Sequence, residues 1–132
     1  MNNGLKRNRN PENAPYSDSV EVTGAGRWVH FAGQMGGQWK EDGSYELPES
    51  VEQQISGVFA NLGTALAAVS AEPAHVVSMT VYLRDIIDFP AYSRVRTEFF
   101  GDTPPASIVV QALLKDEAHI ELVPIAFVPE AE

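Results

Sequence analysis

The chain has 132 residues, of which 44% are hydrophobic and 20% are charged, and it has no cysteine. These values predict one globular domain with a hydrophobic core, and they exclude disulfides, thiolate nucleophiles and cysteine metal sites. The net charge of −9 divides into +2 for residues 1–13 (three cations, one carboxylate) and −11 for the remainder. Such an acidic body disfavours binding to nucleic-acid phosphates.

The N-terminal residues are polar and lack the apolar stretch of a signal peptide, and no apolar run approaches the roughly 20 residues of a membrane span. We therefore expect a cytoplasmic protein without a membrane partner. Residues 1–13 are predicted to form a flexible arm and residues 14–132 a single domain. The basic residues of the arm are compatible with an anionic partner, although a solvated terminus is the simpler interpretation.

The first half of the chain predicts a hairpin and a helix. Residues 19–23 alternate polar and apolar, residues 24–26 form a turn, and residues 27–33 resemble the returning strand. A short extra strand is placed near residues 35–39. Apolar residues spaced by three and four then predict a helix over residues 50–70, which Ser50 and Gln53 would open as a capping box.

The second half predicts a strand over 76–83, a helix over 89–100, and two strands over 107–114 and 119–128. Asp88 is placed as the N-cap of the second helix, which tolerates Pro90 in its first turn and ends before Gly101. Pro124 lacks a ladder donor and is therefore expected at an edge or a bulge.

The element order is β-β-α-β-α-β-β, which predicts an α+β fold with both helices on one face of a mixed sheet. The other face carries apolar and small side chains. A monomer rarely exposes such a surface, so we expect an oligomer.

Five short segments stand out, in this order: Ala14-Pro-Tyr-Ser17, Phe31-Ala-Gly-Gln34, residues 81–89, Glu98-Phe-Phe100 with Pro104-Pro-Ala106, and Ile120-Glu-Leu122. In this order they resemble motifs of the RidA/YjgF family of enamine/imine deaminases, also described as endoribonuclease L-PSP. The resemblance implies a chorismate-mutase-like homotrimer with a central barrel, small-molecule clefts between subunits, and no metal or cofactor.

The resemblance implies that Glu121 positions the attacking water. The family's carboxylate-binding arginine matches Ser107, which offers one neutral hydroxyl in place of a charged fork of five donors. Losing that clamp predicts at least about a thirtyfold loss for a carboxylate substrate. The implied substrate-binding residues are Tyr16, Ala32, Gly33, Ser93, Ala106, Ser107, Ile108 and Val109.

Each of these residues also has a structural interpretation. Glu121 fits an outward-facing strand carboxylate, Ser107 an ordinary strand-start serine, and Tyr16 a ring that packs the arm onto a neighbouring subunit. Arg94 and Arg96 are candidates to replace the missing cation, although solvated helix-face charges are the simpler interpretation.

The sequence therefore predicts hydrolysis of a small enamine or imine, with a substrate shifted from the usual 2-imino acids. A non-catalytic trimer that binds a small molecule is the alternative. RNA cleavage is a third hypothesis, and the acidic body argues against it. The three histidines match no metal-ligand spacing, so no metal site is predicted.

Overall fold

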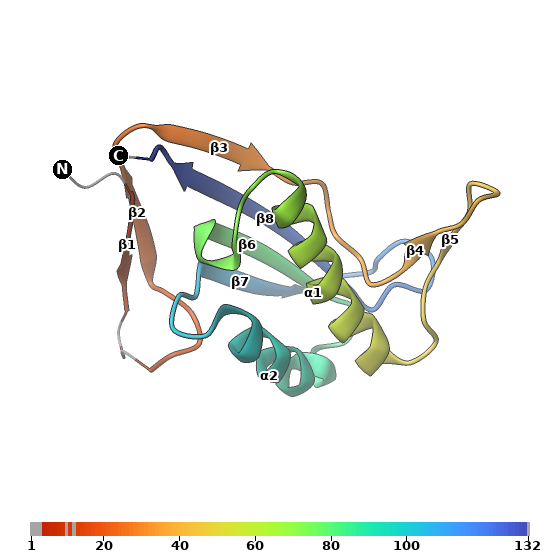
Figure 1. The fold of residues 1–132 in the computed structure, drawn as a ribbon. Helices are drawn as coiled ribbons and strands as arrows, with labels where there is room; N and C mark the ends of the chain where they lie inside the picture. The colour runs from red at the N-terminus through yellow and green to blue at the C-terminus, as the bar shows by residue number, and fades with distance from the viewer. Residues whose placement is uncertain (1–3, 10, 12, 132) are drawn as a thin grey trace.

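The computed structural model describes residues 4–9, 11 and 13–131. Over these residues the chain forms eight strands, two α-helices and two short 3₁₀ helices (Figure 1). In chain order the elements are β1 (Gly4–Asn8), β2 (Ser19–Thr23), β3 (Gly26–His30), β4 (Gln38–Trp39), β5 (Tyr45–Glu46), α1 (Val51–Ala68), η1 (Pro73–His75), β6 (Val76–Leu83), η2 (Ile86–Asp88), α2 (Phe89–Phe100), β7 (Ala106–Gln111) and β8 (Ile120–Pro129).

The main sheet has the strand order β3-β8-β6-β7, so β3 and β7 are its edges. Strands β6 and β7 run parallel, as a connection through α2 requires, and the other pairs are antiparallel. Both helices lie on the same face of this sheet (Figure 1). The predicted α+β architecture with a mixed sheet is thus confirmed.

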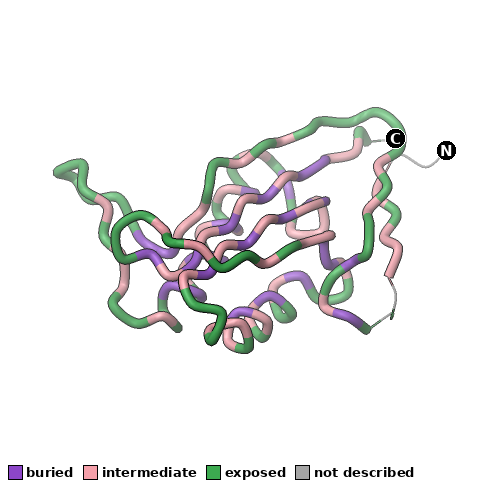
Figure 2. The backbone as a smooth tube through the Cα atoms, turned by 180° about the vertical axis from the view of Figure 1, so that it is seen from behind, coloured by how far each residue is buried: buried purple, intermediate pink, exposed green. Residues whose placement is uncertain are grey.

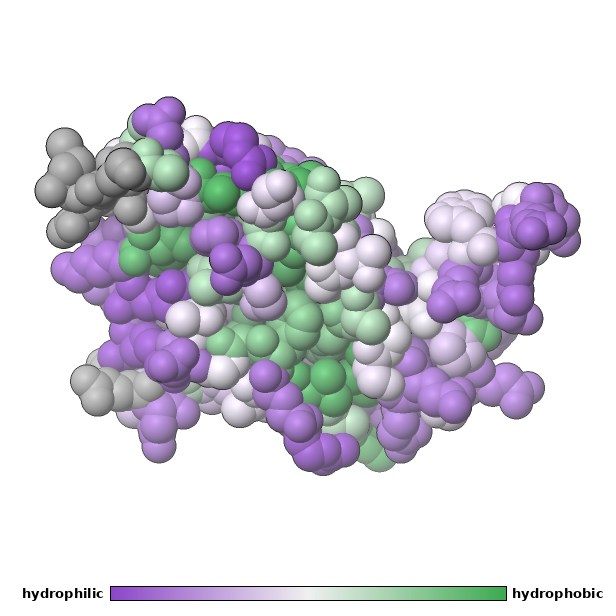
Figure 3. All heavy atoms as spheres, in the orientation of Figure 1, coloured by the Kyte–Doolittle hydropathy of each residue, from purple (hydrophilic) through white to green (hydrophobic). Residues whose placement is uncertain are grey.

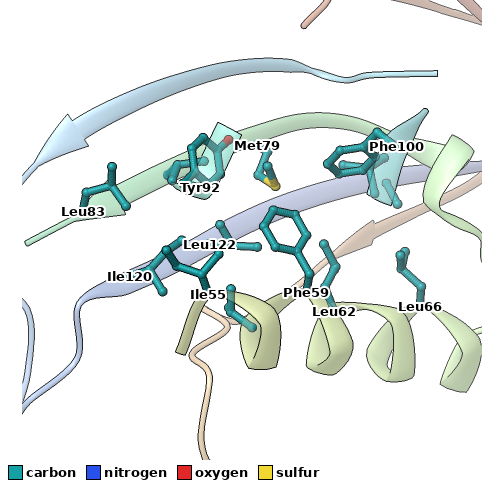
Figure 4. Close-up of a cluster of buried hydrophobic side chains, with 14 of the residues drawn as sticks. Ile55, Phe59, Leu62, Leu66, Met79, Leu83, Tyr92, Phe100, Ile120 and Leu122 are labelled. Carbon is teal, nitrogen blue, oxygen red and sulfur yellow. The ribbon is translucent and has the colours of Figure 1, made fainter. Parts of the chain in front are cut away.

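The hydrophobic core fills the space between α1, α2 and the sheet. Figure 4 shows the buried side chains of α1 pointing toward those of β6, β8 and α2. The Phe59 ring lies 6.1 Å from that of Tyr92 and 5.2 Å from that of Phe99, between ring centroids, and so joins the two helices. The buried residues of α1 are Gln54, Ile55, Val58, Phe59, Leu62 and Leu66, and the apolar ones follow the predicted stripe.

The predicted helix starts have different outcomes. The Ser50 side chain accepts a hydrogen bond of 3.0 Å from the Gln53 amide and caps α1. Among the described residues the Gln53 side chain makes no return bond to Ser50, so only half of the predicted capping box is present. Asp88 is the N-cap residue of α2 as predicted, but its side chain makes no capping hydrogen bond to the described residues. Instead Asp85 accepts from the Ile87 amide at 3.0 Å and caps η2, which leads directly into α2. Gly101 ends α2 with a φ of 59°, a value that favours glycine.

The predicted hairpin of residues 19–33 is wrong. Strand β2 pairs with β1, whereas β3 pairs with β8, about a hundred residues further along the chain. Local alternation predicts a strand but does not identify its partner. The partner of β2 is β1, so residues 4–8, which belong to the predicted flexible arm, form a strand. The extra strand predicted near 35–39 is present as β4, paired with β5.

Two arginines attach the segment around β1 to the body of the protein. Arg7 donates to the carbonyls of Ala74 and Pro104, the latter at 3.2 Å. Arg9 donates to the carbonyls of Ala14 at 2.6 Å and Asp102 at 3.3 Å. Burial lowers the pKa of Arg7 from its ordinary value. These cations therefore contact the protein's own backbone.

The two broad surfaces of the molecule differ. On the helix-bearing side, apolar residues gather over the middle and hydrophilic residues surround them (Figure 3). From behind, no helix crosses the main sheet (Figure 2), and this bare face exposes Trp28 by 54% and Ile108 by 60%. Among the described residues, no helix combines the length and apolar character needed to cross a membrane.

Candidate functional site

A cavity of about 530 Å³ lies at the β7 edge of the sheet, between this strand, α2 and the segment that precedes β2. This volume falls within the usual range for small-molecule sites. Five of the substrate-binding residues implied by the resemblance line it, namely Tyr16, Ser93, Ser107, Ile108 and Val109. The remaining lining residues are Pro15, Phe89 and Arg96.

The segment around Tyr16 is held against the turn that precedes β7. The Ser17 hydroxyl donates to the Pro104 carbonyl at 2.6 Å, and the Ser17 amide donates to the Pro105 carbonyl at 3.0 Å. Ser17 is 2% exposed, so these bonds are shielded from water. The turn and the segment thereby form one wall of the cavity.

Ser107 faces the helices. It pairs with Met79 of β6, a core residue that is 2% exposed, and paired residues on neighbouring strands point to the same face. The side chain of Ser107 is therefore directed toward α2, on the side where the cavity lies. At this position the strand contributes a neutral hydroxyl.

The cationic group of the cavity comes from α2. Arg96 is 4% exposed, and its guanidinium carbon lies 4.9 Å from the Tyr92 ring centroid and 5.6 Å from the Phe89 ring centroid. Its Nη2 donates to the Ser93 hydroxyl at 2.8 Å. The interpretation of Arg96 as a solvated helix-face charge was therefore wrong, whereas Arg94 is exposed.

Arg96 has unused hydrogen-bonding capacity. Within the described part of the chain, its buried Nε has no hydrogen-bond partner and no carboxylate forms an ion pair with it. Burial raises the pKa of the neighbouring Tyr92 above its ordinary value, and the charge of Arg96 opposes this effect. Tyr92 therefore remains a neutral phenol beside the cation at physiological pH and cannot neutralise it.

Glu121 lies on the opposite face of the sheet. It pairs with Tyr82 of β6, three positions after Met79, and an odd separation along a strand reverses the face. In one chain the structure therefore brings Tyr16, Ser93 and Ser107 together but not Glu121. No hydrogen bond or ion pair joins the carboxylate of Glu121 to the described residues.

Ala32 and Gly33 lie beside Glu121 and do not line the cavity. The Phe31 amide donates to the Pro124 carbonyl, and the Gln34 amide donates to the Leu122 carbonyl. The chain therefore advances three residues from Phe31 to Gln34 while β8 advances two from Leu122 to Pro124, as in a β-bulge. Such an extra residue redirects nearby side chains. Pro124 lies in the inner strand β8 and not at a sheet edge, and it stands where the regular ladder with β3 ends. Ala106 is placed at the start of β7, bridged to Ser17.

Gly33 leaves room for the carboxylate of Glu121. A Cβ atom at this position would lie 1.9 Å from Oε2 of Glu121. We expect Gly33→Ala to displace the carboxylate and to lower any activity that depends on it by at least about tenfold. The free energy of unfolding should change by less than about 1 kcal/mol, because the contact is with the mobile end of a side chain.

The matched control for this prediction is Gly63→Ala in α1. A Cβ there would meet only Phe99, at an ordinary 3.8 Å. Steady-state rates and thermal unfolding of both variants provide the measurement. An active Gly33→Ala protein would show that the carboxylate is not held in this position during turnover.

The sequence analysis named Arg96 only as one of two candidates for the missing cation, and it did not name Phe89 as a cavity residue. The signal was present in the spacing, since Phe89, Tyr92 and Arg96 follow one another at intervals of three and four and so share the core-facing stripe of α2. Among the described residues, no group of three or more His, Asp or Glu side chains is arranged to hold a metal ion.

Comparisons with known proteins agree on one family. The family model described as Endoribonuclease L-PSP matches residues 7–128. A RutC family protein of Pyrococcus abyssi is 32% identical over 114 residues, 86% of each chain. A 2-iminobutanoate/2-iminopropanoate deaminase of Dermatophagoides farinae is 31% identical over 82% of this chain and 81% of its own.

Solved structures give the same result for the fold. A Rid-family protein of unknown function from Yersinia pestis, YyfB, superposes with a TM-score of 0.72 at 31% identity, covering 86% of this chain and 87% of its own. A putative endoribonuclease from Thermotoga maritima superposes with a TM-score of 0.68 at 27% identity, covering 88% of each chain. The sheet and helices described above are therefore those of this family.

Proposed function

Because the chain belongs to the RidA/YjgF family, whose model is described as Endoribonuclease L-PSP, we propose that it hydrolyses a small reactive enamine or imine. Related proteins named 2-iminobutanoate/2-iminopropanoate deaminase occur in a mite and in the goat. The observation that carries the proposal is the cavity at the β7 edge, which gathers five of the side chains that the resemblance implies for substrate binding.

The proposed site is completed by a second copy of the chain. Ser107 and Glu121 point to opposite faces of the sheet, so one chain cannot direct both at the same small molecule. The apolar residues of the bare face, including Trp28 and Ile108, would be covered in a homotrimer. We therefore propose clefts between subunits, each with a cavity from one chain and Glu121 from another.

In the proposed reaction, Glu121 accepts a proton from water while the water oxygen bonds to the imine carbon. The imine nitrogen takes up a proton, and the carbon–nitrogen bond of the resulting carbinolamine then breaks. One imine and one water yield one carbonyl compound and one ammonia. Tyr16, Phe89 and Val109 surround the apolar part of the substrate. Backbone groups around residues 106–109, together with the Ser107 hydroxyl, orient its polar end.

The substrate is proposed to differ from the usual 2-imino acids. Ser107 supplies a single neutral donor where the family pattern has an arginine, so a carboxylate cannot be clamped from β7 by a bidentate charged fork. A substrate with a different shape or a different anion position fits this wall of the cavity.

A non-catalytic binding trimer is the alternative, supported by the same cavity. RNA cleavage receives less support, because Arg7 and Arg9 of the basic segment donate to backbone carbonyls within the protein. Phosphate contacts require free cations, and the rest of the chain is acidic.

The test is release of ammonia from 2-iminopropanoate and from the imine of 4-methyl-2-oxopentanoate, each generated in situ. We expect a rate above background for both and a preference for the larger imine, measured on protein whose mass by light scattering is three times that of the chain. A folded trimer without activity on either imine would contradict the deaminase proposal and favour the binding alternative.

A further inference from the structure

Arg96 is a buried cation without a counterion in the described residues, and it lines the cavity. We propose that Arg96 binds the carboxylate of the ligand, and so performs from α2 the task that the missing arginine would perform from β7. This inference deepens the proposed function, since it rests on the same cavity and specifies the class of ligand.

An unpaired buried charge is costly, and a protein retains it only where another group compensates. Stacking on Phe89 and Tyr92 and the bond to Ser93 offset part of this cost. They leave Nε without an acceptor. A carboxylate in the cavity would supply the counterion that the described residues lack, and a guanidinium presents its donors to such a group as a planar fork.

The lining of the cavity determines the rest of the ligand. Phe89, Ile108 and Val109 offer apolar contacts, and Arg96 is the single cation among the lining residues. One cation neutralises a singly charged carboxylate but leaves a phosphate dianion with an uncompensated negative charge, so the lining favours a monoanionic carboxylate on an apolar body. The volume of about 530 Å³ admits a body larger than that of 2-iminopropanoate.

Moving the cation from strand to helix shifts the anion within the cleft. Ser107 and Arg96 stand on different walls of the cavity, one on β7 and the other on α2. A carboxylate bound at α2 would change the position of the reacting carbon of a small 2-imino acid relative to the water that Glu121 is proposed to deprotonate. The relocated cation thus explains how a carboxylate substrate can be retained while the preferred substrate changes.

Binding of 4-methyl-2-oxopentanoate and of its uncharged amide, measured by NMR titration of the assembled full-length protein, tests the proposal without any turnover. We expect the carboxylate to bind more tightly than the amide, and Arg96→Gln to weaken carboxylate binding by at least about thirtyfold with little effect on the amide. Arg94→Gln, which removes the same charge from an exposed position of the same helix, should bind like the wild type.

Equal carboxylate affinity in wild type and Arg96→Gln would overturn the proposal. Wild-type protein that binds neither compound would do so too. Hydrolysis is measured separately. If the protein binds the carboxylate through Arg96 but is inactive, the deaminase function alone is contradicted. If the protein is active and Arg96→Gln binds as the wild type does, the role of Arg96 alone is contradicted.

Thermal unfolding of Arg96→Met separates a ligand-binding role from a structural one. Replacing an unpaired buried charge by an apolar side chain of similar length should leave stability unchanged or raise it, while abolishing the preference for the carboxylate over the amide. Arg96→Lys keeps the charge without the fork and is expected to retain a reduced preference. Marked destabilisation of Arg96→Met with the preference intact would assign Arg96 to the core and overturn the proposal.

Discussion

Glu121→Gln is expected to lower the rate of imine hydrolysis by about 10²- to 10⁴-fold, the usual contribution of a general base. Glutamine keeps the shape of the side chain but cannot accept the proton of the attacking water at neutral pH. The carboxylate of Glu121 makes no hydrogen bond to the described residues, so the substitution removes no structural contact that the single chain shows. The measurement is kcat/KM for ammonia release.

Glu117→Gln is the matched control for this variant. Glu117 is exposed on the loop that leads into β8, and the substitution removes the same charge four residues away. We expect this control to keep the wild-type rate, and Glu121→Gln to keep its affinity for 4-methyl-2-oxopentanoate. A Glu121→Gln protein with normal turnover would exclude Glu121 as the base, whereas lost binding together with lost turnover would assign it to ligand binding.

The helices and most strands could be predicted from local patterns. The apolar stripe and the Ser50 cap define α1, and the run of β-branched residues defines β6. Strand partners could not be predicted in this way. Residues 19–23 alternate as a strand must, but nothing in their sequence shows that β1 pairs with them. Pairing depends on contacts distant in sequence, and the polar residues of β1 resemble a solvated terminus.

Residues of the candidate site that belong to a sequence motif could be predicted. Residues whose role depends on their burial could not. The resemblance led to Tyr16 and Ser107, which the structure places on one cavity. An arginine on a helix is usually solvated. Only the three-dimensional packing shows that Arg96 lies under Phe89 and Tyr92 with an unused donor. The separation of Glu121 from the cavity follows from strand register, which the sequence alone does not fix.

The second large effect is expected on stability, from Gln54→Leu. Gln54 is 1% exposed, and its Nε2 donates to the carbonyls of Pro48 at 2.9 Å and Glu117 at 3.1 Å. Its Oε1 accepts from the His119 amide at 2.8 Å. Leucine fills a similar volume but leaves all three backbone groups without these partners. We expect the free energy of unfolding to fall by about 2–4 kcal/mol, because unsatisfied polar groups are costly.

Urea unfolding at a fixed protein concentration measures this loss, since the stability of an oligomer depends on concentration. Gln53→Leu is the control, because the Gln53 side chain is exposed on the adjacent position of α1.

The hydrogen bonds of Gln54 also hold the chain just before β8, and the His119 amide lies two residues from Glu121. Gln54→Leu should therefore also lower activity under conditions in which the protein is fully folded. Full activity and an unchanged urea midpoint would show that the loops before α1 and before β8 are held by other contacts.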